Sequence, residues 1–213
     1  MPVLTEEKKR SGGVVPPRRP DGFDGDGGDG DNGSAFPISK AQLATWALIT
    51  GVTMLFSGLI SAYVVLRGVP TWQNIAIPPL VWVNTLVLIA SSAALEIARA
   101  AVKRDRQREL RLWLSLAGIL GLVFLGFQVW VWRQLVNAGV YLPTNLHSSF
   151  FYVLTATHGF HVLGGLGGLA FVLRRAFQGR LSPARHEALK LGALYWHFMD
   201  VVWIVLFLLL VFA

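Results

Sequence analysis

The arrangement of apolar residues is the most informative feature of the sequence. From residue 41 onward they occur in long runs rather than in the stripes of an amphipathic helix. A helix needs about 20 apolar residues to cross a hydrocarbon core roughly 30 Å thick. Five runs reach this length: Ala41–Leu66, Pro79–Ala98, Leu110–Trp132, Ser148–Leu173 and Ala188–Phe212. Because a backbone in lipid must satisfy its own hydrogen bonds, the pattern predicts five transmembrane helices. The short connections make consecutive helices antiparallel.

The first 40 residues have a different character. A basic block occupies residues 8–19, and residues 21–33 contain five Asp and six Gly. Such a segment buries too little apolar surface to fold, so we expect it to be disordered. The sequence therefore predicts an all-α polytopic membrane protein, with a disordered tail over residues 1–40 and a five-helix transmembrane bundle over residues 41–213.

Lys and Arg are distributed unevenly over this topology. Six lie in the N-terminal segment, six in the second connection (counting Arg111 at the start of the third run) and five in the fourth (counting Lys190 at the start of the fifth run), so 17 of the 19 share one side. Only Arg67 and Arg133 fall on the other side. Because cytoplasmic loops carry the excess of Lys and Arg, the N-terminus is predicted to be cytoplasmic and the C-terminus outside. This distribution also argues against nucleic acid as the partner of a chain with net charge +7.

The residue composition limits the kinds of functional site that the chain can hold. Hydrophobic residues make up 54% of the chain and charged residues 15%, well below the roughly 25% charge of soluble domains. The chain has no Cys, which excludes disulfides, zinc–thiolate sites and iron–sulfur clusters. Polar side chains within the predicted spans are the remaining candidates for function, since they are costly in lipid. They are Asn84, Glu96, Gln128, His158, His161, His197 and Asp200, of which Glu96 is interpreted as interfacial.

The fourth and fifth predicted helices carry His–x–x–His and His–x–x–Asp spacings, each on one helix face. The rise per residue places His161 about 20 Å and Asp200 about 17 Å from the cytoplasmic ends, so these two side chains are predicted to meet. Gly164, Gly165 and Gly168 are predicted to allow close contact between the two helices. A hydrogen-bonded network that locks the helices together is the favoured interpretation. A metal or haem site and a proton-transfer site are the alternatives.

Several segments resemble one family of membrane proteins. TATHGFHVLGG at residues 155–165 and YWHFMDVVW at residues 195–203 are similar to two helices of subunit III of the haem-copper terminal oxidases. Supporting similarity occurs, in the same order, in LFSGLISAY at residues 55–63, NTLVLIASS at residues 84–92 and the stretch ending at Gln128. The resemblance extends from about Trp46 to the C-terminus.

The resemblance implies a non-catalytic subunit of a respiratory oxidase in a bacterial-type cytoplasmic membrane. Such a subunit binds neither haem nor copper, which are expected in partner subunits, and has no catalytic residues of its own. It packs against catalytic subunit I, holds phospholipid and supports proton uptake. The site for the electron donor, cytochrome c or quinol, lies on other subunits. The family's histidines on these helices belong to the fold, in agreement with the network interpretation.

The chain also departs from many members of the family. It has five helices where many have two more at the N-terminus, and Val52 and Val131 stand where many carry Glu. A proton-related role of those carboxylates is therefore not expected here. Two alternatives remain: a five-helix protein associated with nitric oxide reductase, and a free-standing membrane protein that uses its His and Asp residues to hold metal or haem.

Overall fold

The computed structural model describes residues 39–70, 72–73, 75–183 and 186–212. These residues form five helices: α1 (Lys40–Leu66), α2 (Leu80–Lys103), α3 (Gln107–Asn137), α4 (Leu146–Phe177) and α5 (Glu187–Phe212). Each helix is long and apolar enough to cross a membrane. The predicted all-α, five-helix fold is confirmed. The predicted disorder of the tail concerns residues that lie almost wholly outside the described part.

Most helices are longer than the apolar runs that predicted them. α2 continues to Lys103 and α3 begins at Gln107, so only three residues connect them. Asp105 in this turn has a φ of 53°, a left-handed conformation that Asp tolerates better than most residues. α4 likewise continues through Arg174 and Arg175 to Phe177. Hydropathy marks the part of a helix in lipid, whereas helical hydrogen bonding continues beyond it into the basic segments.

Side-chain caps fix the start of two helices. The Ser39 hydroxyl accepts a hydrogen bond from the backbone N–H of Gln42, and the Gln42 side chain accepts from the backbone N–H of Ser39. Asn145 and Ser148 make the same reciprocal arrangement at the start of α4. Each box satisfies backbone donors that the first helical turn leaves free.

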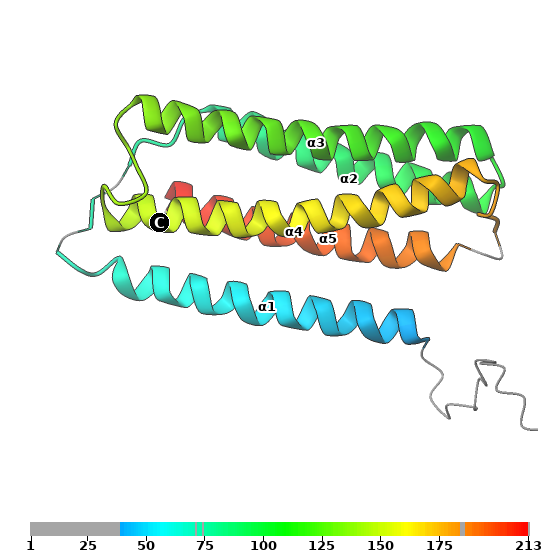
Figure 1. The fold of residues 1–213 in the computed structure, drawn as a ribbon, viewed down its shortest axis with the longest axis horizontal. Coiled ribbons are helices and arrows are strands. Elements are labelled where there is room, and N and C mark those ends of the chain that lie inside the picture. The colour runs from blue at the N-terminus through cyan, green and yellow to red at the C-terminus, as the bar shows by residue number, and fades with distance from the viewer. Residues whose placement is uncertain (1–38, 71, 74, 184–185, 213) are drawn as a thin grey trace, which may run out of the picture. The chain divides into compact units, whose positions relative to one another are not determined.

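The helices alternate in direction, and α5 lies among them (Figure 1). α2 packs along α3, α3 packs against α4, and α5 contacts α1, α2 and α4. Among the described residues, α1 contacts only α4 and α5. As a result α1 is the least buried helix and α5 the most buried.

Polar side chains join the helices through the apolar core. Because lipid offers no competing hydrogen-bond partners, these side chains form hydrogen bonds to other helices or to backbone carbonyls of their own helix. Examples that cross between helices are Ser91 to the Ala117 carbonyl at 2.9 Å, Trp203 to Thr85 at 3.0 Å, Trp132 to Thr155 at 3.1 Å and Tyr195 to the His161 carbonyl at 3.2 Å.

Candidate functional site: a polar cluster between two helices

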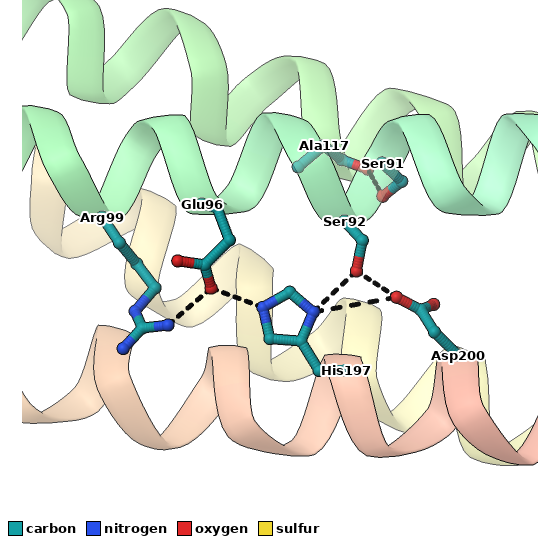
Figure 2. Close-up of polar contacts among 7 residues, drawn as sticks. All are labelled: Ser91, Ser92, Glu96, Arg99, Ala117, His197 and Asp200. Atoms are coloured by element: carbon teal, nitrogen blue, oxygen red, sulfur yellow. Dashed lines mark hydrogen bonds and ion pairs between the residues drawn. The ribbon is translucent and has the colours of Figure 1, made fainter.

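A cluster of polar side chains lies between α2 and α5 (Figure 2). We call Ser92, Glu96, Arg99, His197 and Asp200 the α2–α5 polar cluster. The three members on α2 are spaced four and three residues apart, and the two on α5 are three apart, so each set lies on one helix face. The antiparallel packing of α2 against α5 brings the two faces together.

The α2–α5 polar cluster forms a continuous chain of contacts. Glu96 Oε1 lies 2.5 Å from Arg99 Nη1 and 2.5 Å from His197 Nε2. The other ring nitrogen, His197 Nδ1, lies 2.7 Å from the Ser92 hydroxyl oxygen. The Ser92 hydroxyl also contacts Oδ2 of Asp200. The His197 imidazole on α5 therefore connects two side chains of α2, the Glu96 carboxylate and the Ser92 hydroxyl. The Ser92 hydroxyl in turn contacts the Asp200 carboxyl group, which is on α5 like His197 (Figure 2).

Exposure falls steadily along this chain of contacts. The side chain of Glu96 is 48% exposed, that of His197 34% and that of Asp200 11%. Glu96 is the outer end of the cluster and Asp200 the inner end. The interpretation of Glu96 as interfacial agrees with its exposure but omits its bond to His197.

The structure corrects the predicted meeting of His161 and Asp200. Asp200 on α5 points to Ser92 on α2, whereas His161 on α4 turns toward α1. The Nδ1 atom of His161 bonds to the Thr157 carbonyl at 2.8 Å, and its ring lies 5.7 Å from that of Phe56. The prediction was wrong because similar depth in the membrane does not make two residues face each other.

His158 occupies a third environment. It is fully buried, and neither ring nitrogen has a hydrogen-bond partner among the described residues. Its ring lies 4.9 Å from Trp203, 5.8 Å from Phe124 and 6.3 Å from Phe56. His158 therefore packs as an aromatic ring among rings from three other helices.

Asn84 and Gln128 form a separate pair. The Asn84 amide nitrogen donates to Gln128 Oε1 at 3.3 Å, and both residues are buried between α2 and α3. Six polar residues were predicted to serve in a structural polar network or in subunit or lipid contacts, and they lie at several places in the bundle: His158, His161, His197, Asp200, Asn84 and Gln128. The α2–α5 polar cluster holds two of them, and the α2–α3 pair holds another two.

Of the three glycines predicted to allow close contact between α4 and α5, only Gly165 lies against α5. A Cβ atom added at Gly165 would lie 3.2 Å from Trp196 and from Tyr195 on α5. At Gly164 and Gly168 an added Cβ would meet nothing within 4 Å. These two glycines face the groove between α1, α4 and α5 instead, so they are corrected from helix-packing to groove-lining positions.

Sequence reasoning missed two members of the α2–α5 polar cluster, Ser92 and Arg99, and one further histidine. Ser92 and Arg99 could have been found by extending the helix face that carries Glu96. His147, at the start of α4, accepts a bond from the Ile75 backbone N–H at 3.2 Å and stacks on Trp72 at 5.0 Å. It attaches the α1–α2 connection to α4, a contact with no signal in helical spacing.

The geometry also bears on metal ligation. Within the described residues, no three His, Asp or Glu side chains are placed as a metal-binding group. The three histidines predicted as candidates each have other neighbours. His197 bonds to Glu96 and Ser92, His161 bonds to a backbone carbonyl, and His158 is enclosed by aromatic rings.

These features define a class of protein: a polytopic membrane bundle of five helices with polar side chains placed between the helices. Comparison with known proteins identifies the family. Residues 66–213 match the family model of cytochrome c oxidase subunit III. The chain belongs to this family.

Individual relatives agree with the family match. Cytochrome c oxidase subunit 3 of Thermostichus vulcanus is 37% identical over 166 residues, which cover 74% of this chain and 80% of that protein. The corresponding protein of Synechocystis is 39% identical over 161 residues, covering 73% and 68%. A probable cytochrome c oxidase subunit 3 of Mycobacterium bovis is 34% identical over 184 residues, covering 82% and 88%.

Proposed function

We propose that this chain is the non-catalytic subunit III of a haem-copper terminal oxidase of aerobic respiration. Its role there is to pack against catalytic subunit I and to support assembly and stable turnover. The observation that carries the proposal is the subunit III family match, which includes all of α2, α3, α4 and α5. Relatives named as oxidase subunits align over most of both chains.

The use of the histidines supports a non-catalytic role. His197 is bonded through both ring nitrogens and His158 packs among aromatic rings, and within the described residues no three His, Asp or Glu side chains are placed to hold a metal ion. Haem and copper are assigned to the partner subunits on this proposal. Val52 and Val131 are buried apolar residues, so we assign them packing and no proton-related role.

Contacts with membrane lipid follow from the outward faces of the helices. Large apolar side chains such as Met54, Leu112 and Phe160 are at least 70% exposed, which suits an environment of lipid or of another membrane subunit. A groove of about 680 Å³ between α1, α4 and α5 is lined by Gly164, Gly168 and mostly apolar side chains. Its shape and lining support the proposal that the chain holds phospholipid.

The proposed location is a bacterial-type cytoplasmic membrane, with the N-terminus in the cytoplasm and the C-terminus outside. The support is the positive charge of the helix ends. The α2–α3 turn and the end of α4 carry Arg and Lys, as cytoplasmic ends of spans do.

Purification from the native membrane tests the function. A tag on this chain is expected to co-purify a large catalytic subunit, with the optical bands of haem, and the chain stripped of its partners is expected to show none. In the matched experiment, the complex is purified through the catalytic subunit from cells that lack this chain. It is expected to keep its haem spectrum and to lose activity faster during turnover.

Two outcomes would contradict the proposal. Haem or metal retained by the lone chain would make it a cofactor-binding protein, with His158, His161 and His197 as ligands. Co-purification with a nitric oxide reductase would assign it to that complex instead. The names of the relatives do not favour either alternative.

A further inference from the structure

The α2–α5 polar cluster has a geometry suited to moving a proton. His197 Nδ1 and Asp200 Oδ2 are 3.9 Å apart, too far for a direct hydrogen bond. The Ser92 hydroxyl lies within bonding distance of both atoms. A hydroxyl group can donate one hydrogen bond while it accepts another, so Ser92 can bridge an imidazole and a carboxyl group.

The heavy-atom positions are compatible with two arrangements of protons. In the first, His197 is an imidazolium: Nε2–H donates to Glu96, Nδ1–H donates to Ser92, and the Ser92 O–H donates to an ionised Asp200. In the second, Asp200 carries a proton on Oδ2 and donates to Ser92, the Ser92 O–H donates to Nδ1, and neutral His197 still donates to Glu96 through Nε2. Every hydrogen bond persists in both, with donor and acceptor reversed on either side of Ser92.

We propose that Ser92 relays a proton between His197 and Asp200, with Asp200 as the site that holds the proton and Glu96 as the group that orients the His197 ring through Nε2. In the transfer, the N–H bond at His197 Nδ1 breaks and an O–H bond forms at Ser92 Oγ. The original Ser92 proton passes to Asp200 Oδ2. The imidazolium and the carboxylate both become neutral, and Ser92 ends as a hydroxyl again, so charge and atoms balance.

The second oxygen of Asp200 identifies it as the proton-holding end. Oδ1 is buried and has no hydrogen-bond partner among the described residues. An ionised carboxylate would leave part of its negative charge on this atom without a donor. A protonated carboxyl group places only a carbonyl oxygen there, which is less costly to bury than a charge. Glu96, at the other end of the cluster, is 48% exposed.

Few other charged groups face the relay. α2 contributes Arg99, whose Nη1 is bonded to Glu96. α5 contributes Lys190, which lines a pocket together with Arg99 and His197. His158 and His161 on α4 are turned to other neighbours, the rings around His158 and the Thr157 carbonyl. α1 has no Asp, Glu, His, Lys or Arg between residues 41 and 66. The relay therefore works with one imidazole, one hydroxyl and one carboxyl group.

Infrared difference spectroscopy on the intact, membrane-purified complex tests the proposal. The wild-type minus Asp200→Asn spectrum is expected to contain the C=O stretching band of a protonated carboxyl group. That band is expected to shift in Ser92→Ala, and its exchange in heavy water is expected to slow by an order of magnitude or more. Ser92→Thr keeps a hydroxyl and is expected to restore fast exchange.

Ser91→Ala is the matched control, because the Ser91 hydroxyl bonds to the Ala117 carbonyl across α2 and α3 and takes no part in the relay (Figure 2). Its spectrum is expected to equal that of the wild type. The absence of any protonated carboxyl band from Asp200, or equal exchange in Ser92→Ala and the wild type, would overturn the proposal. If Asp200→Asn does not assemble, the wild-type minus Ser92→Ala spectrum decides, since Asp200 must lose its bonded hydroxyl there. These readouts concern this chain alone and do not depend on its proposed function.

Discussion

His197 on α5 and Glu96 on α2 are joined by a contact of 2.5 Å between Nε2 and Oε1. The contact lies toward the basic end of α2, where Arg99 bonds to the same carboxylate oxygen. It fixes the ring of His197, so that the opposite nitrogen faces Ser92. A surface carboxylate thus orients a histidine whose other side reaches into the bundle.

Glu96→Gln is expected to lower stability only slightly, because the carboxylate is 48% exposed and solvent screens its charge. Exposed ion pairs contribute roughly 0.2–1 kcal/mol, and a Gln oxygen can still accept from His197 Nε2. Thermal denaturation of the purified complex in detergent is the measurement. A loss well above about 1 kcal/mol would show that Glu96 has a greater role in the bundle than its exposure indicates.

Gly165→Leu is expected to force α4 and α5 apart, because even a Cβ atom would lie 3.2 Å from Trp196 and Tyr195. Overpacking of this kind costs about 1–3 kcal/mol. The yield of assembled complex and its melting temperature are the measurements. Gly164→Leu is the matched control, since an added Cβ there meets nothing within 4 Å. Equal effects of the two substitutions would contradict the close contact at Gly165.

Asn84 and Gln128 are expected to be energetically coupled across α2 and α3, because the buried Asn84 amide nitrogen donates a hydrogen bond to Gln128 Oε1. Interhelical hydrogen bonds in membrane proteins contribute about 0.6 kcal/mol on average. Asn84→Leu and Gln128→Leu should each destabilise the bundle, and the double variant should lose less than the sum of the two. A double-mutant cycle by reversible denaturation in detergent measures this coupling. Additive effects would show that the pair does not form.

His158→Phe is expected to preserve assembly and the haem spectrum of the complex. The imidazole is buried among Phe124, Trp203 and Phe56, and neither ring nitrogen bonds to a described residue. A phenyl ring removes two buried polar atoms and keeps the aromatic packing, although its larger size requires small shifts of its neighbours. Absorption spectra and gel filtration of the complex are the measurements. Loss of a cofactor band in this variant would instead make His158 a ligand.

The number and approximate position of the helices could be predicted from the sequence, because bilayer thickness sets the length of an apolar span. The five runs correspond to α1 through α5 in order. Their ends could not be predicted as well. Hydropathy falls where a helix leaves the lipid, but Lys103 on α2 and Arg174 on α4 are still helical.

The family was also accessible from the sequence, because its motifs are local. The stretches around His158 and around His197 lie within single helices and can be compared residue by residue. The family match over residues 66–213 agrees with that resemblance. Four of the polar side chains inside the predicted spans, Asn84, Gln128, His158 and Asp200, are buried within the bundle, as expected because lipid cannot solvate them.

The partner of each polar side chain was decided only by the tertiary structure. Five spans, their order and the approximate depth of each polar residue followed from the sequence, because the rise per residue and the bilayer thickness are fixed. The sequence did not determine how far each helix is rotated about its axis, which depends on packing with its neighbours. That rotation turned Asp200 toward Ser92 instead of His161, and placed Gly165 but not Gly164 against α5.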